Sequence, residues 1–126
     1  VLLINKYSAS DGDLFAWSFK ANKIGKVIGT RTWGGIVGIS GPLPYMDGTD
    51  VRVPFFTNYD AKTGQWIVEN HGVDPDILID NDPVKEQSGE DQQLNKAIEV
   101  ILQELKDRKP LPSVPAPRTY KDLGVE

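Results

Sequence analysis

Ser10 stands where an apolar segment gives way to a helix-compatible one, which is a position suited to nucleophilic chemistry. In α/β proteins, sites form outside the carboxyl ends of the strands. The first amides of a helix are unpaired and carry partial positive charge, so the Asp11 N–H could stabilise an oxyanion formed beside the Ser10 hydroxyl. On spacing alone, the alternative is that Ser8, Ser10 and Asp13 only cap the helix.

Glu69 and His71 are the other candidates for acid–base chemistry, and His71 is the single histidine of the sequence. On a strand the two side chains would share a face, but they would be poorly placed for a proton relay. By residue type alone, Glu69 is a solvated glutamate near a hairpin, and His71 is a residue of the site rim or surface.

Several other chemistries are excluded by residue type or spacing. The sequence has no cysteine, which excludes a disulfide scaffold, a thiolate zinc site and a cysteine nucleophile. The glycine-rich loop 31–38 (RTWGGIVG) has neither dinucleotide-binding nor P-loop spacing. The run Asp74-Pro75-Asp76 lacks the alternating oxygen ligands of a calcium loop and is interpreted as a turn. We therefore expect no cofactor and no metal.

The charge balance restricts the partners. The formal net charge of −4 argues against nucleic acid, and the basic residues between 20 and 31 are interpreted as a solvated helix end. No apolar run approaches the roughly 18 residues of a membrane span, so we expect no membrane partner. Absence of cysteine is compatible with cytoplasmic and exported proteins alike, which leaves the compartment open.

The elements that must position Ser10 can be predicted from the first 29 residues. Residues 1–5 (VLLIN) form a continuous apolar run, typical of a strand buried on both faces. Residues 14–24 are predicted as a helix packed between layers and 26–29 as a second strand. A strand, helix and strand this close together predict a βαβ unit with a parallel pair. Because a protein seldom begins with an interior strand, we expect the chain to be a piece of a longer one.

β-Hairpins and a short apolar run are predicted next. Turns at Asp47-Gly48 and at residues 60–64 separate segments of alternating or aromatic-rich sequence. We expect strands at residues 42–46, 51–59, 66–69 and 77–79.

A helix and a tail are predicted to end the chain. Apolar residues repeat at three and four positions from Leu94 to Leu105, which predicts an amphipathic helix that begins at a capping pair, Ser88 and Asp91. We expect its apolar face to pack against the sheet; that face comprises Leu94, Ile98, Ile101 and Leu105. Four prolines then predict an extended tail, so we divide the chain into a unit 1–109 and a tail 110–126.

Three segments resemble, in family order, motifs of the tricorn-type peptidases, a branch of the S41 (carboxyl-terminal processing) serine peptidases. They are residues 5–13 (NKYSASDGD), 29–35 (GTRTWGG) and 68–76 (VENHGVDPD). The resemblance runs from residue 1 to about residue 105. It implies an α/β fold of the ClpP/crotonase-like kind, of which this chain is only the C-terminal, nucleophile-bearing portion.

The resemblance implies a role for three residues. Ser10 matches the nucleophile, and Asp11 matches the position whose amide forms half of the oxyanion hole. Glu69 matches the catalytic glutamate, which steadies a histidine base through a second serine. In the family that histidine, that serine and the other oxyanion donor lie in a preceding subdomain. We therefore expect the isolated chain to be inactive.

Trp33, Gly34 and Gly35 are candidates for a substrate loop. They occupy the place where the tail-specific branch of S41 carries a lysine base within a Phe-Gly-Lys-Gly loop. No lysine stands at this place here, so a serine–lysine dyad is excluded and a histidine base is needed.

The function implied by the resemblance is hydrolysis of peptide bonds in oligopeptides or proteins, with Ser10 as the attacking group. The partners implied are a peptide substrate, the upstream subdomain of the same polypeptide, and further copies in a homo-oligomer. Two alternatives stay open. The chain could be a non-catalytic ligand- or peptide-binding module of the same fold, or a structural piece whose partner is another chain.

Overall fold

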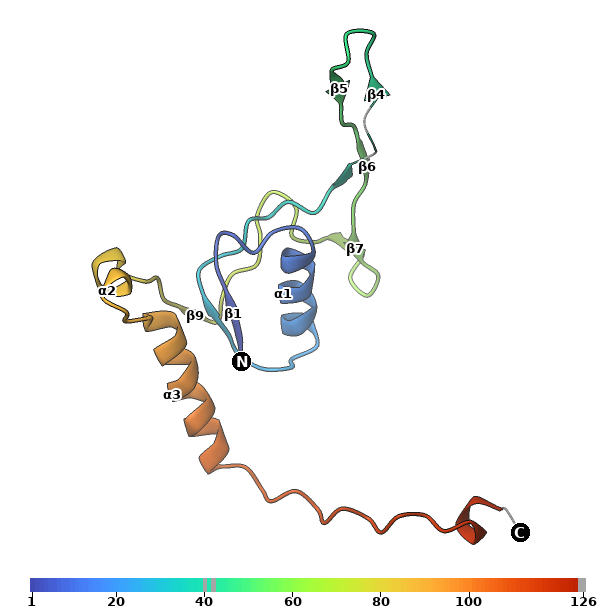
Figure 1. The fold of residues 1–126 in the computed structure, drawn as a ribbon, viewed down its shortest axis with the longest axis vertical. Coiled ribbons are helices and arrows are strands. Elements are labelled where there is room, and N and C mark those ends of the chain that lie inside the picture. The colour runs from blue at the N-terminus through green and yellow to red at the C-terminus, as the bar shows by residue number, and fades with distance from the viewer. Residues whose placement is uncertain (40, 42, 125–126) are drawn as a thin grey trace.

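The computed structural model describes residues 1–39, 41 and 43–124. Pro42, at the start of one expected strand, lies outside them. Strand β1 (Leu2–Ile4) leads through a turn into helix α1 (Asp11–Ala21), and the chain returns as β2 (Val27–Gly29), parallel to β1. Strand β9 (Ile77–Leu78) pairs in parallel with the other edge of β2 (Figure 1). The α/β class and the predicted βαβ unit are confirmed.

The core lies between this sheet and α1. Ile4 and Val27 of the strands pack with Ala16 of α1 and with Val73, which precedes β9. Leu3, by contrast, is 39% exposed. The expectation that the first strand is buried on both faces is therefore wrong for this chain, because β1 is an edge strand and α1 covers one face of the sheet.

The boundaries of α1 lie earlier than the expected 14–24. The helix begins directly after its N-cap, Ser10, and ends at Ala21. Lys23 then takes a positive φ of 53°, which stops the helix before Ile24.

Two hairpins and a short strand pair follow. Strand β3 was not expected, and the single strand expected at 51–59 is divided among β5, β6 and β7. Gly48 and Gly64 donate their N–H groups to Tyr45 O and Asp60 O at 3.0 and 2.7 Å, which confirms both predicted turns. The first hairpin projects from the rest of the chain in Figure 1. The antiparallel pairs are β3 (Gly38–Ile39) with β6 (Pro54–Phe56), β4 (Leu43–Pro44) with β5 (Asp50–Val51), and β7 (Tyr59–Asp60) with β8 (Gln65–Trp66).

Two helices come next, one of which the sequence analysis missed. Helix α2 (Pro83–Gln87) is capped by Asp82. Helix α3 (Gln92–Lys106) is capped by Asp91, which accepts the Leu94 N–H at 2.9 Å. The predicted pairing of Ser88 with Asp91 is wrong, because Ser88 is the C-cap of α2.

The expected packing of α3 is also wrong for this chain. Its apolar residues stay half exposed, with Ile98 at 46%, and Ala97 is its buried residue. Figure 1 shows the cause: α3 meets the sheet near its start and then runs away from it. The four residues of the expected packing face, all exposed, are Leu94, Ile98, Ile101 and Leu105.

Beyond α3 the chain is extended and exposed as far as a short 3₁₀ turn (Lys121–Leu123), which follows the last proline. The expectation of a wholly extended tail is corrected by that turn. The division into a unit 1–109 and a tail 110–126 stays a prediction. Across the described ranges, no helix has the length and apolar character needed to cross a bilayer.

Candidate active site

Ser10 occupies the turn between β1 and α1 in a strained conformation, with φ 55° and ψ −110°. The N-caps of α2 and α3, Asp82 and Asp91, have the extended backbone usual at such positions. A non-glycine residue at positive φ costs on the order of 1–3 kcal/mol and persists only where its surroundings enforce it. Ser10 is the N-cap residue of α1, and Asp13 Oδ2 accepts its backbone N–H at 2.9 Å, but this position does not require the strain.

Asp11, the first residue of α1, presents its backbone N–H beside Ser10. The neighbouring amides of Gly12 and Leu14 donate to Ala9 O and Ser10 O at 2.9 and 3.0 Å. Among the described residues, no acceptor is found for the Asp11 N–H. This amide is therefore available to a developing negative charge at the helix N-terminus.

Asp13 is a site residue that the sequence analysis treated only as a candidate cap. Its side chain is fully buried, and its carboxylate accepts three backbone N–H groups. Oδ2 accepts from Ser10 at 2.9 Å and from Gly35 at 3.3 Å, and Oδ1 accepts from Gly34 at 2.9 Å. Its spacing, three residues after the cap, matches a capping box. The spacing does not predict the hydrogen bonds that Gly34 and Gly35 donate to it.

The loop 33–35 is held between segment 8–13 and residues 69–72. The Trp33 N–H donates to Ser8 O at 3.0 Å, and the Gly34 O accepts the Asn70 N–H at 2.8 Å. Gly34 has φ 86°, and a Cβ there would lie 2.5 Å from the Gly72 nitrogen. Only glycine fits so close a backbone approach. The Trp33 ring is largely exposed.

Glu69 lies in a turn and not on the strand expected at 66–69, which ends at Trp66. Val68 and Asn70, on either side, have positive φ values of 66° and 62°. The half-buried Glu69 side chain points its Oε2 at two loop amides, Ile36 N–H at 2.7 Å and Val37 N–H at 2.9 Å. Because 69–71 is a turn, the expected shared strand face of Glu69 and His71 does not exist.

His71 is exposed and belongs to a surface ion-pair network. Its Nε2 lies 2.8 Å from Asp74 Oδ2, and Arg31 Nε donates to Asp74 Oδ1 at 2.7 Å. These hydrogen bonds, first from His71 and then from Arg31, hold the pKa of Asp74 below its ordinary value. The interpretation of His71 as a surface residue is confirmed.

Other charges near this network also have protein partners. Lys20 Nζ lies 3.2 Å from Asp76 Oδ1, and Asp76 Oδ2 accepts the Val27 N–H at 2.9 Å. Lys20 is therefore more than a solvated helix-end residue, since it ties α1 to the segment before β9. No cluster of three or more potential metal-ligating side chains occurs in the described part of the chain.

One pocket of about 370 Å³ brings the candidates together. Ser10, Trp33 and Glu69 line it, while Asp11 and Gly34 do not. Its apolar wall is formed by alternate residues, Gly35, Val37 and Ile39, the last of which lies in β3. The lining residues are Ser10, Trp33, Gly35, Val37, Ile39 and Glu69.

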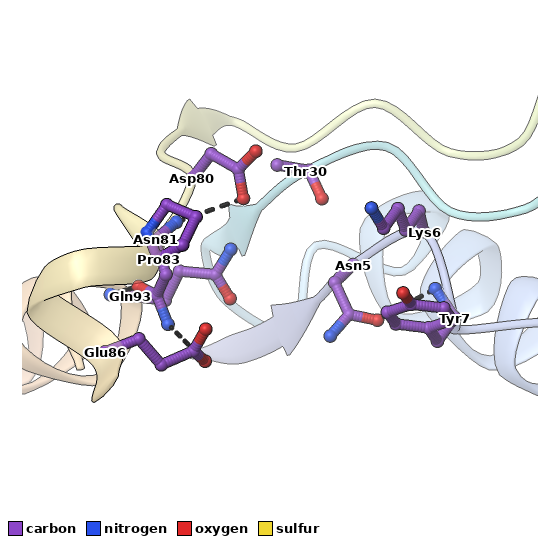
Figure 2. Close-up of a pocket in the computed structure, with 9 residues that line it drawn as sticks. All are labelled: Asn5, Lys6, Tyr7, Thr30, Asp80, Asn81, Pro83, Glu86 and Gln93. Carbon is purple, nitrogen blue, oxygen red and sulfur yellow. Dashed lines mark hydrogen bonds between the residues drawn. The ribbon is translucent and has the colours of Figure 1, made fainter. Parts of the chain in front are cut away.

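A second, more polar pocket of about 250 Å³ lies at the carboxyl ends of the three parallel strands. Figure 2 shows Asn5 and Lys6, which follow β1, facing Asn81 and Glu86 from the region of α2. Asn81 Nδ2 donates to Glu86 Oε1 at 3.3 Å. None of the predicted site residues lines this pocket.

Comparisons with known proteins show the family to which this chain belongs. Residues 1–79 match the family described as Peptidase family S41. The chain is 43% identical over 117 residues to the Tricorn protease of Thermoplasma acidophilum, a match that covers 92% of the chain and 11% of that protein. It is 43% identical over 108 residues to the Putative Tricorn-like protease C-terminal subunit of Sulfurisphaera tokodaii, covering 86% of the chain and 12% of the relative.

A solved structure agrees with these matches. The structure titled "Crystal structure of the tricorn protease" superposes with a TM-score of 0.75 at 45% identity, over 82% of this chain and 10% of that one. The chain thus spans about a tenth of the length of the relatives it matches. From the matched family and the curated relatives together, the chain belongs to peptidase family S41, in its tricorn-type branch.

Proposed function

We propose that this chain carries the nucleophile of a serine peptidase, and that Ser10 is that nucleophile. In the proposed reaction, Ser10 Oγ attacks the scissile carbonyl while a histidine from the preceding part of the polypeptide takes its proton. The Asp11 N–H stabilises the oxyanion. The proton then passes to the leaving amine, and water resolves the acyl-enzyme.

The observation that carries this proposal is the conformation of Ser10. Ser10 has φ 55° directly before α1, at the end of the connection 5–10 that follows β1. This strained position resembles that of nucleophile elbows, which expose the hydroxyl on a strained turn. Strain of this kind clusters at active sites. Membership of a peptidase family agrees with this role.

The backbone amides of residues 34–37 bear on where the second oxyanion donor comes from. The N–H groups of residues 34–37 are all engaged, two by Asp13 and two by Glu69. The Ser10 N–H is engaged by Asp13 as well. None of these donors is free to bind an oxyanion, so we assign the second donor, like the histidine, to the preceding subdomain.

Glu69 and the loop 33–35 take supporting roles in the proposal. Glu69 orients the histidine through a second serine. Two backbone amides hold its Oε2, which fixes the carboxylate in place for this role. Trp33, Gly34 and Gly35 form a substrate loop, since the exposed Trp33 ring and Gly35 line the same pocket as Ser10.

The remaining assignments follow from the relatives. We propose that residues 1–109 are the C-terminal part of a ClpP/crotonase-like catalytic domain that ends in an amphipathic helix, and that residues 110–126 are a tail. The substrates are oligopeptides or proteins, and the intact protein acts as a homo-oligomer. The TM-score of 0.75 to a tricorn protease supports this placement.

The test uses the full-length polypeptide that contains this chain and the histidine base. Ser10→Ala is expected to abolish peptide hydrolysis and labelling by diisopropyl fluorophosphate. Ser8→Ala is the matched control, a serine two residues away whose hydroxyl accepts the Asn5 N–H. Wild-type hydrolysis by Ser10→Ala, or loss of labelling by Ser8→Ala alone, would refute the assignment of the nucleophile.

A further inference from the structure

The buried carboxylate of Asp13 is the feature of the site that the proposed mechanism leaves without a role. Its side chain is 0% exposed, and within the described residues no lysine, arginine or histidine pairs with it. A buried carboxylate is tolerated only where hydrogen-bond donors surround it. Here the three donors are the backbone amides of Ser10, Gly34 and Gly35.

These hydrogen bonds join Ser10 to the segment 34–37, to which Glu69 is also hydrogen-bonded. Asp13 accepts from the first two amides of the segment 34–37, and Glu69 Oε2 accepts from the last two, at 2.7 and 2.9 Å. The Asp13 Oδ2 that reaches the loop also accepts the Ser10 N–H at 2.9 Å. Two carboxylates from distant parts of the sequence are therefore linked through four successive amides.

We infer that Asp13 is a positioning residue, which holds Ser10 in its strained conformation and fixes Ser10 relative to Glu69 through the segment 34–37. The inference rests on the proposed role of Ser10 as nucleophile. Asp13 touches neither substrate nor reacting atoms and acts only through the Ser10 backbone. Without its carboxylate, Ser10 is free to relax toward negative φ, which moves the hydroxyl away from its place in the pocket.

The kinetic test is Asp13→Asn in the full-length polypeptide. The amide has the same shape but only one acceptor oxygen, and its NH₂ group faces backbone donors. We expect kcat to fall by about tenfold or more with KM within about twofold, because the nucleophile is displaced while the substrate contacts stay. Asp91→Asn is the matched control. It removes a carboxylate that caps α3 and should leave both constants unchanged.

A structural readout separates positioning from stability. Amide hydrogen exchange should speed up at Gly34 and Gly35 in Asp13→Asn, and in Asp91→Asn it should not. If Asp13→Asn does not fold, Asp13→Glu replaces it. That variant keeps the charge but displaces it by one methylene, and a lower kcat at unchanged KM is again expected.

The outcomes distinguish this inference from the proposed function. If Ser10→Ala is inactive and a folded Asp13→Asn or Asp13→Glu keeps wild-type kcat, this inference alone is overturned. Unchanged exchange at Gly34 and Gly35 overturns it as well. Wild-type turnover by Ser10→Ala refutes the proposed function, and this inference with it.

Discussion

At the scale of single residues, three acidic side chains make three different sets of contacts. Both carboxylate oxygens of Asp13 and the Oε2 of Glu69 accept backbone N–H groups, while Asp74 pairs with Arg31 and His71 at the surface. The first two organise the pocket around Ser10. The hydrogen bonds to the third, from His71 and then Arg31, lower its pKa.

Glu69→Gln in the full-length polypeptide should lower kcat and leave KM nearly unchanged. A carboxylate that orients the histidine contributes most when the histidine becomes charged, which happens in the transition state. The loss should be smaller than that caused by Ser10→Ala. Both constants should be measured with a neutral and a basic P1 substrate. Wild-type kcat on both would remove Glu69 from the mechanism, and a raised KM for the basic substrate alone would assign it to substrate binding.

Asp74 should make part of the stability of the chain dependent on acid. Its pKa lies below the ordinary 3.8, through hydrogen bonds from His71 and then Arg31. A carboxyl with a depressed folded-state pKa stabilises the fold above its unfolded pKa, and this stabilisation is lost as the pH falls through the folded value. Between pH 7 and pH 3, the urea midpoint of the wild type should therefore fall more than that of Asp74→Asn. Parallel curves for the two proteins would contradict the assignment.

At the scale of elements, the site is built from three connecting segments and the first turn of α1, which contributes Asp11 and Asp13. Segment 8–13, the loop 33–35 and the turn 68–72 are held together by backbone hydrogen bonds such as Asn70 N–H to Gly34 O, at 2.8 Å. Gly34 and Gly72 face each other so closely that a Cβ on either would meet the backbone of the other segment, at 2.5 and 2.4 Å.

Gly34→Ala should destabilise the chain more than Gly48→Ala does. Both glycines have positive φ, at 86° and 83°, so both substitutions carry a conformational cost of about 1 kcal/mol. A Cβ at Gly48 meets nothing within 4 Å, whereas one at Gly34 meets backbone. The difference between the two free energies of unfolding, measured in urea, isolates the close approach. Equal losses would show that the two segments separate easily.

The exposure of α3 gives a second prediction at this scale. Ile98→Ala should cost less than about 1 kcal/mol in this chain, because the side chain is 46% exposed and leaves no enclosed cavity. Ile28→Ala, at a fully buried position of β2, is the comparison and should cost about 2–5 kcal/mol. Urea unfolding of both variants measures this. Similar losses would mean that α3 packs more tightly than its exposure indicates.

The parts that could be predicted from sequence are those fixed by local patterns. The parallel strands around α1 follow from an apolar run, a helix-compatible segment and a second apolar run, and the turns follow from Asp47-Gly48 and residues 60–64. The mutual positions of Ser10, Asp13 and Glu69 could not be predicted this way. They depend on backbone amides of residues 34–37, which carry no side-chain signal.

At the scale of the whole molecule, the chain contains the proposed nucleophile, Ser10, without a histidine placed to act as its base. Its single histidine is engaged at the surface by Asp74, and it does not line the pocket that contains Ser10. The relatives it matches are about ten times longer. The complete reaction is therefore proposed for the longer polypeptide.

The isolated chain should hydrolyse peptides no faster than the buffer alone. Without a general base, and with one oxyanion donor at most, the rate of a serine peptidase falls by several powers of ten. Fluorogenic oligopeptides, assayed with the purified chain, Ser10→Ala and His71→Ala, provide the measurement. Turnover that is abolished by Ser10→Ala and also by His71→Ala would identify a base within the chain.

The reciprocal fit of Gly34 and Gly72 has a consequence for protein engineering. The segments 8–13, 32–37 and 68–73 form one transferable unit, since each is held in place by the backbone of another. Segment 32–37 contacts both of the others, so a chimaera that exchanges it with a homologue inherits mismatched contacts on two sides, and one that exchanges 8–13 or 68–73 inherits them at 32–37. A crossover anywhere between residues 13 and 68 separates segments of this unit, so single crossover points for recombination libraries belong before residue 8 or after residue 73.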